Sequence, residues 1–385
     1  MRNGRGAVVM LVATLSAACT SAPRHQPHFL PKIESAIPLP PSFPAPITPP
    51  DNRLTLQKAE LGRYLFYDVR LSHNATESCA SCHQQQFAFS DHRPRAIGST
   101  GQQHSRNSMG LTNVAYRRTL TWADPKMRLL EQQVLVPLTN EHPVELGMAG
   151  RYELLLQRIG SDPRYRALFA TAFPGEEKPI TIDNIARALA TFERTLISAR
   201  SPYDRLVLNG DSTALSPAAW RGMRLFFSTR LRCSSCHGGA DLSSPADGQQ
   251  FQNTGLYDRK ISRKTDPGLS SMSRSRGDVG KFRIPALRNV AVTAPYMHDG
   301  STPTLSQVID DYAAGGRAAR LSGKRPARGV AVRRFTISAE EKQDLIAFLD
   351  SLTDQTFLTD PRFGNPWPAT EYEAGSSRAG YKIRP

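Results

Sequence analysis

The sequence predicts an all-α protein in which two domains of similar build follow one another. The first observation is a repeated pentad, because residues 79–83 and 233–237 both read Cys-x-x-Cys-His. The second is an echo ahead of each pentad, LGRYLFY at 61–67 and RGMRLFF at 221–227. The third is that neither half shows the alternating polar and apolar run typical of strands. A body of about 310 residues also suits two cores better than one.

Helix start signals locate the main elements in order. Thr181 caps the helix that closes the first half, Ser216 and Pro217 open the helix of the second echo, and Ser338 begins a capping box. The apolar residues that recur at helical spacing are Ile185, Leu189, Phe192 and Leu196 after Thr181, and Leu345, Phe348, Leu349 and Leu352 after Ser338. We expect the two halves to join near residues 200–214.

The pentads predict two covalently bound c-type haems. Two thiols at this spacing can form thioethers with one haem, and the adjacent imidazole reaches its iron. The attachment residues are Cys79, Cys82 and His83 for the first haem, and Cys233, Cys236 and His237 for the second. A zinc ribbon is the alternative, but its cysteine pairs stand roughly 15–20 residues apart. The fold class is therefore two cytochrome c-like haem domains in tandem.

Residues 1–18 predict an export signal peptide, with two arginines, a short apolar run and small residues before the cleavage site. Cys19 stands where a bacterial lipobox has its lipidated cysteine, but Ser16 replaces the usual leucine, so plain cleavage is the alternative. We expect a periplasmic protein, anchored to the membrane if Cys19 is lipidated. The predicted organisation is a signal peptide (1–18), a proline-rich tether (19–50), two domains (51–205 and 206–360) and a basic tail (361–385).

The chain is strongly basic, with a formal net charge of +15 that falls by two when the signal peptide leaves. Basic residues gather in 317–334 and in the tail after Gly375. Such a field attracts an acidic protein partner or an anionic membrane, and solubility alone is the alternative interpretation. Export argues against a nucleic-acid partner.

Residues 61–148 and 281–312 resemble the bacterial di-haem cytochrome c peroxidase and MauG superfamily, and residues 121–125 and 141–147 look most like its MbnH-type enzymes. The resemblance implies an oxidoreductase that reacts with hydrogen peroxide, forms a high-valent di-haem state and oxidises a tryptophan of an exported partner, for which a copper-binding protein is one candidate. One alternative is a cytochrome c peroxidase that detoxifies peroxide with electrons from a small redox protein. A simple electron carrier is another.

In this superfamily the N-terminal haem meets peroxide, and a glutamate moves the proton during cleavage of the bond between the peroxide oxygens. The resemblance places this role on Glu145, which follows Gln133 and Pro137 at the family's spacing. A two-residue insertion leaves Glu141 and His142 as alternatives.

Family members that need reductive activation carry a distal histidine after an Ile-Gly pair. Here Ser99 follows Ile97 and Gly98. Serine is a poor iron ligand, so we expect the first haem site to be open without activation. His104 is close enough in sequence to substitute, and a surface histidine is its other interpretation.

The C-terminal haem of the family handles electrons, and its axial methionine lies fourteen residues beyond the histidine of a Pro-Tyr-x-His-Asp-Gly motif. That histidine is His298 here, and the fourteenth position is Tyr312, as in MauG. A phenolate stabilises ferric and higher oxidation states of the iron. Met297 and Met272 are alternative ligands, and a structural role for Tyr312 is the plainer interpretation.

The resemblance also implies a tryptophan and a calcium ion between the haems. Trp122 matches the tryptophan, which relays oxidising equivalents between the irons. Asn107 through its side chain, with Thr293 and Pro295 through their carbonyls, matches the calcium ligands. MauG has a second relaying tryptophan two residues before the second pentad. Leu231 stands there, so the exit route must differ.

Overall fold

The computed structural model describes residues 48–368 except 244, 246 and 258–264, together with Met1, Leu39, Ala45 and Pro46. The predicted signal peptide, Cys19, nearly all of the tether and the tail beyond 368 lie outside the described residues. In the described part of the chain, no helix has the length and apolar character needed to cross a bilayer.

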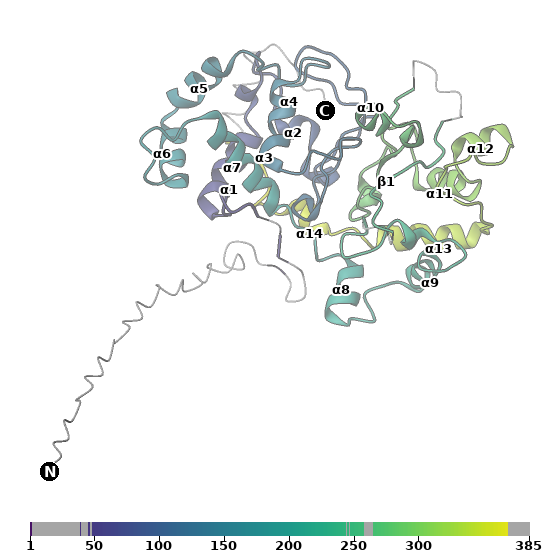
Figure 1. Ribbon diagram of the computed structural model, residues 1–385. Coiled ribbons are helices and arrows are strands. Elements are labelled where there is room, and N and C mark those ends of the chain that lie inside the picture. The colour runs from purple at the N-terminus through teal and green to yellow at the C-terminus, as the bar shows by residue number, and fades with distance from the viewer. Residues whose placement is uncertain are drawn as a thin grey trace.

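The fold is mostly helical, as predicted, and its two halves lie side by side (Figure 1). The first half contains α1 (Leu56–Phe66), α2 (Cys79–Cys82), α3 (Leu130–Gln133), α4 (Leu135–Thr139), α5 (Tyr152–Ser161), α6 (Pro163–Ala172) and α7 (Ile182–Thr195). The second contains α8 (Pro202–Asn209), α9 (Pro217–Phe226), α10 (Ser270–Ser273), α11 (Leu305–Ala313), α12 (Arg317–Ser322) and α13 (Ala339–Asp350), and α14 (Gln355–Thr359) follows. Short 3-10 turns are η2 (Val69–Leu71), η3 (Gln85–Phe87), η4 (Val114–Tyr116), η5 (Cys233–Ser235), η6 (Arg276–Asp278) and η7 (Val290–Val292).

One antiparallel strand pair, β1 (Phe251–Gln252) with β2 (Phe282–Arg283), was not foreseen. Each strand has two residues, which is too short to show an alternating pattern in the sequence.

The three predicted helix starts are confirmed. The hydroxyl of Thr181 accepts a hydrogen bond from the backbone of α7, and that of Ser216 accepts one from α9. Ser338 and Glu341 form the predicted capping box at the start of α13. These caps depend on neighbouring residues alone, which is why the sequence reveals them.

The glycine in each echo allows two helices to cross at close range. A Cβ added at Gly62 of α1 would lie 2.0 Å from the carbonyl oxygen of Ala188 in α7. A Cβ added at Gly222 of α9 would lie 1.9 Å from that of Asp344 in α13. The internal repeat therefore corresponds to two helix pairs that cross in the same way.

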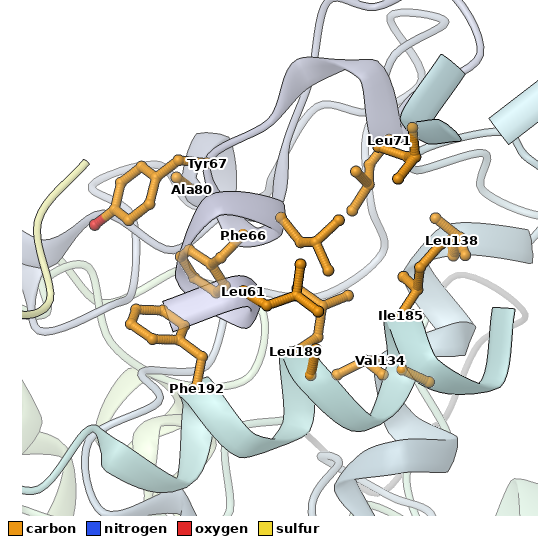
Figure 2. Close-up of a cluster of buried hydrophobic side chains, with 14 of the residues drawn as sticks. Leu61, Phe66, Tyr67, Leu71, Ala80, Val134, Leu138, Ile185, Leu189 and Phe192 are labelled. Atoms are coloured by element: carbon orange, nitrogen blue, oxygen red, sulfur yellow. The ribbon is translucent and has the colours of Figure 1, made fainter. Parts of the chain in front are cut away.

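An aromatic pair supports each crossing. Phe66 of α1 and Phe192 of α7 point toward one another in the first core, with ring centroids 5.1 Å apart (Figure 2). In the second core, Phe226 of α9 and Phe348 of α13 are also 5.1 Å apart. All four rings are almost fully buried, so each pair anchors its core.

Substituting either crossing glycine should destabilise the protein strongly. We expect Gly62→Ala and Gly222→Ala each to cost about 3 kcal/mol or more, because the backbone carbonyl cannot move aside without separating the helices. Gly160→Ala in α5 is the control, since its Cβ would meet only the Cδ1 of Ile180 at 3.9 Å. Denaturant unfolding of the three variants measures the difference. Equal stability of all three would contradict the close crossing.

The chain returns to the first core at its described end. Phe357 and Phe363 are buried in the first core cluster, and Trp367 packs against it. The Tyr67 hydroxyl donates a hydrogen bond to the Phe363 carbonyl at 2.7 Å. Sequence analysis assigned residues up to 360 to the second domain and the rest to a tail. Residues 355–367 instead cover the first core, a long-range contact that no local pattern reports.

Candidate active site

The second pentad opens onto a cavity of about 590 Å³. It lies within the usual size range of small-molecule and cofactor sites. The predicted site residues that line it are Cys233, Cys236, His237, Tyr312 and Trp122, together with Met297 and His298 of the Pro-Tyr-Met-His-Asp-Gly motif. Segments far apart in the sequence thus meet around one cofactor-sized space.

Both pentad histidines are oriented in the same way. The Nδ1 atom of His83 is 2.8 Å from the Phe89 carbonyl oxygen, and that of His237 is 3.1 Å from the Leu242 carbonyl oxygen. A carbonyl only accepts, so Nδ1 carries the proton and Nε2 is the free ligand atom. Burial lowers the pKa of both rings, that of His237 to about 4, which favours the neutral form that binds iron.

Arg283 supplies a test of whether a haem fits the second cavity. Its guanidinium is buried, and burial lowers its pKa to about 9. In the described part of the chain it donates to neutral acceptors, namely the carbonyls of Thr121 and Ile284 and the sulfur of Met109. A buried cation without a carboxylate partner at the wall of a cavity suits the propionate of a haem.

Tyr312 of α11 borders the same cavity as His237. Among the described residues its hydroxyl has no hydrogen-bond partner, and burial raises its pKa. Met297 also lines the cavity, whereas Met272 is 48% exposed and lies away from it. The geometry thus retains Tyr312 and Met297 as candidate ligands and gives Met272 no role.

Around the first pentad, the structure separates the three candidates for proton transfer. Glu141 and His142 are exposed. Glu145 is half-buried, and burial raises its pKa while His104 and then Asn140 lower it. Burial raises the pKa of the Cys79 thiol, and the charges of Glu193 and, to a smaller degree, Glu145 add to that shift. Of the three candidates, Glu145 is therefore the one that is partly buried, and it stays the predicted acid–base group.

Backbone hydrogen bonds hold the Glu145 loop against α4. The Leu146 amide donates to the Pro137 carbonyl at 2.9 Å, and the Met148 amide donates to the Leu138 carbonyl at 2.8 Å. Gln133 is the last residue of α3, and Val134 separates it from α4. The structure thus brings Pro137 next to the Glu145 loop, and the role of Gln133 stays a prediction.

The segment that carries a distal histidine in some relatives packs directly on the Glu145 loop. The Ser99 amide donates to the Glu145 carbonyl at 2.8 Å, and the Ser99 hydroxyl is 3.4 Å from Nδ1 of His73. His104 is not a detached surface residue, because its Nε2 lies 3.8 Å from a carboxylate oxygen of Glu145. Its Nδ1 lies 3.0 Å from the amide nitrogen and 3.2 Å from the carbonyl oxygen of Arg106, which fixes the ring beside that carboxylate.

A small cavity of about 90 Å³ lies between the two halves. It collects Trp122, Asn107, Thr293 and Pro295, the predicted relay and calcium ligands. The Asn107 amide group donates to the Arg93 and Pro94 carbonyls, so its side-chain oxygen remains for a cation. Three arginines line the same cavity and oppose a cation there: Arg117, Arg283 and Arg288. The calcium ion therefore stays a prediction.

Sequence reasoning missed two polar groups, one half-buried and one buried. Tyr257 contacts both His298 and Asp299 of the motif, although 41 and 42 residues separate them. The carboxyl of Glu193 in α7 is buried, and burial raises its pKa to about 8. The motif could have drawn attention to His298 and Asp299, but no signal in the sequence indicates Tyr257 as their partner.

Both haems should be covalently attached. We expect haem-dependent peroxidase staining to survive denaturing electrophoresis, and pyridine haemochrome analysis to give two haems per chain, because each pentad supplies both thioethers. Replacing Cys233 and Cys236 with serine should leave one. Loss of all staining on denaturation would contradict the assignment.

Comparisons with known proteins agree with this arrangement. A family model described as di-haem cytochrome c peroxidase matches residues 56–213. The methylamine utilization protein MauG of Methylorubrum extorquens is 33% identical over 344 residues, which cover 89% of this chain and 90% of that protein. Cytochrome c551 peroxidase of Pseudomonas aeruginosa is 34% identical over 256 residues, 66% of this chain and 70% of that protein. A solved MauG-like protein associated with microbial copper homeostasis is 40% identical with a TM-score of 0.79, covering 86% of this chain and 99% of that one.

Proposed function

Since this chain belongs to the family of di-haem cytochrome c peroxidases and MauG proteins, oxidoreductases that use peroxide, we propose that it oxidises a tryptophan of an exported partner protein. In this proposal hydrogen peroxide reacts with the fully ferric enzyme, without prior reduction. The bound haems supply the iron that binds peroxide and stores two oxidising equivalents.

The observation that carries the proposal is the pairing of Ser99 with Glu145. Ser99 stands at the position where some relatives carry a blocking histidine. The amide of Ser99 donates a hydrogen bond to the backbone carbonyl of Glu145, the proposed proton-transfer residue. In this proposal the resting site has its acid–base group in place and, with serine at position 99, no blocking histidine there. The resemblance implies a histidine at this position in peroxidases that need reductive activation, so Ser99 is the residue that favours the proposed function over theirs.

Glu145 performs the proton transfer in this proposal. As a carboxylate it takes the proton from the inner oxygen of peroxide and delivers it to the outer oxygen, which leaves as water. Partial burial strengthens its basicity, since a raised pKa means a greater affinity for that proton. His104 is the neighbour of this carboxylate, with its Nε2 3.8 Å from a Glu145 oxygen.

Tyr312 supports the same function from the second haem. Its unbonded hydroxyl borders the cavity that His237 also lines, and an anionic phenolate would favour an oxidised iron. Trp122 lines this cavity as well as the small cavity between the halves, a position suited to sharing oxidising equivalents.

An acidic partner fits the surface near the second cavity. Its lining includes Arg230, Arg232 and Arg333, and the basic segment 317–334 lies close by in sequence. Complementary charge mainly accelerates and orients docking. Because a structural relative is described as associated with copper homeostasis, we propose an exported copper-binding protein, encoded beside this one, as the first partner to test.

The experiment mixes ferric enzyme with hydrogen peroxide by stopped flow and then analyses the neighbouring gene's product by mass spectrometry. We expect a spectral change without any reductant and an oxygenated tryptophan in the partner. The resemblance to cytochrome c551 peroxidase supplies the competing function, detoxification of peroxide. If the enzyme does not react with peroxide until it is half reduced, and then rapidly oxidises a small cytochrome, that function would be established instead.

A further inference from the structure

We propose that Tyr257 is the exit residue through which oxidising equivalents leave the enzyme, with Asp299 accepting its phenol proton. The inference rests on the proposed function, in which hydrogen peroxide is the oxidant and a partner side chain is the final electron donor. It assigns a redox role to a side chain outside the lining of both cavities.

The exit from the second haem site needs an oxidisable side chain. Leu231, at the position where MauG relays through tryptophan, is buried and aliphatic. Trp122 is held by a hydrogen bond of 2.8 Å from its Nε1 to the Asn107 carbonyl. The aromatic ring next to it is His298, with centroids 6.4 Å apart. A route from Trp122 toward the surface therefore begins at His298.

His298 is fixed between Trp122 and Tyr257. Its ring stacks on Phe282 of β2 with centroids 3.5 Å apart and an angle of 10° between the planes. Its Nε2 is 3.0 Å from the Tyr257 hydroxyl, and the two ring centroids are 5.5 Å apart. Trp122, His298 and Tyr257 thus form a continuous path of ring contacts that leads away from the cavity.

Tyr257 also has a built-in proton acceptor. Its hydroxyl donates to Asp299 at 2.8 Å, and Asp299 also accepts from the Ser301 amide at 3.1 Å. A carboxyl oxygen at this distance is a direct acceptor for the phenol proton. Burial raises the pKa of Tyr257, which therefore keeps its proton until it is oxidised.

The exit step balances in both electrons and protons. Tyr257 gives one electron to the peroxide-oxidised enzyme, its O–H bond breaks, and an O–H bond forms on Asp299. The neutral tyrosyl radical then takes one electron from the partner's side chain, and the proton returns from Asp299 to the phenol. Two such cycles consume the two equivalents delivered by one hydrogen peroxide.

Two other tyrosines, Tyr165 and Tyr296, each lack one of these features. Tyr165 donates to Asp68 at 2.6 Å but is fully buried in the first core, out of reach of a partner. Tyr296 lines the second cavity but donates to the Val290 carbonyl at 3.1 Å, which is too weak a base to take its proton. Tyr257 is only half-buried and has a carboxylate partner.

The test is freeze-quench electron paramagnetic resonance of the haem-loaded enzyme mixed with hydrogen peroxide in the absence of partner. The wild type should give a tyrosyl signal that Tyr257→Phe abolishes. Asp299→Asn should slow its appearance by ~100-fold, the lower range for loss of a general base. Tyr152→Phe is the matched control, because this tyrosine is 38% exposed on α5 and has no carboxylate partner among the described residues. Its signal should equal that of the wild type.

Failure of this inference can be distinguished from failure of the proposed function. If the wild type oxidises the partner's tryptophan and Tyr257→Phe does so at the same rate, the exit role is wrong and the function stands. If no partner is oxidised but the tyrosyl signal appears and depends on Tyr257 and Asp299, the redox role stands and the function fails. A tyrosyl signal that survives Tyr257→Phe overturns the assignment in either case.

Discussion

Replacing Glu145 with glutamine should slow the reaction of ferric enzyme with hydrogen peroxide by about 10²- to 10⁴-fold, the range for loss of a general acid–base group. Glutamine preserves the size of the side chain and cannot accept the proton of peroxide. The measurement is the second-order rate constant for the spectral change after stopped-flow mixing.

The pH dependence of the same rate should identify the carboxylate. Glu145 must be ionised to act as the base, and burial raises its pKa above the usual 4.5. The rate should therefore be full at high pH and fall as the pH drops through a midpoint above 4.5. Glu145→Gln should lack this decline. The charge of His104 lowers the pKa of Glu145, so His104→Gln should move the midpoint upward.

Glu141→Gln is the matched control, because Glu141 lies on the same loop and is exposed. It should react with peroxide as the wild type does. A large defect in Glu141→Gln together with a normal Glu145→Gln would transfer the proton-transfer role to Glu141.

Replacing Tyr312 with phenylalanine should remove the axial ligand of the second haem. Resonance Raman spectra of the wild type should contain an iron-phenolate mode, and Tyr312→Phe should lack it. Tyr312→Met should raise the reduction potential of that haem by roughly 0.1–0.3 V, part of the ~0.8 V range that axial ligands span. Such an enzyme should hold its oxidising equivalents less well and oxidise the partner more slowly.

Tyr296→Phe is the control for this experiment. Tyr296 lines the same cavity, but its hydroxyl is engaged by the Val290 carbonyl, so its loss should leave the phenolate mode intact. Absence of a phenolate mode from the wild type, with an unchanged spectrum in Tyr312→Phe, would instead make Met297 the ligand, since its side chain lines the cavity as well.

Local patterns made much of the fold predictable. The caps at Thr181, Ser216 and Ser338 involve atoms within three residues of one another, so the sequence displays them directly. The repeat around Gly62 and Gly222 can be recognised from the similarity of the two sequences. Its physical reason, the carbonyl of a crossing helix, appears only in three dimensions.

Long-range contacts between single residues were not predictable. Tyr257 meets Asp299 across 42 positions, and no periodicity or spacing rule links a tyrosine to a carboxylate at that distance. The approach of His104 to Glu145 depends on two loops, each shaped by its own backbone hydrogen bonds. The family resemblance located Glu145 because a motif fixes the position of that residue. No motif fixes the positions of Tyr257 and His104, so the resemblance did not indicate them.

The return of residues 355–367 onto the first core has a consequence for how the protein is made. Domains generally fold as units. Here the first core lacks Phe357 and Phe363 until the last part of the body has emerged. Its pentad is thus complete some 280 residues before its core is. A fragment ending near residue 205 would remain in that unfinished state, so the first half should be produced only as part of the whole chain.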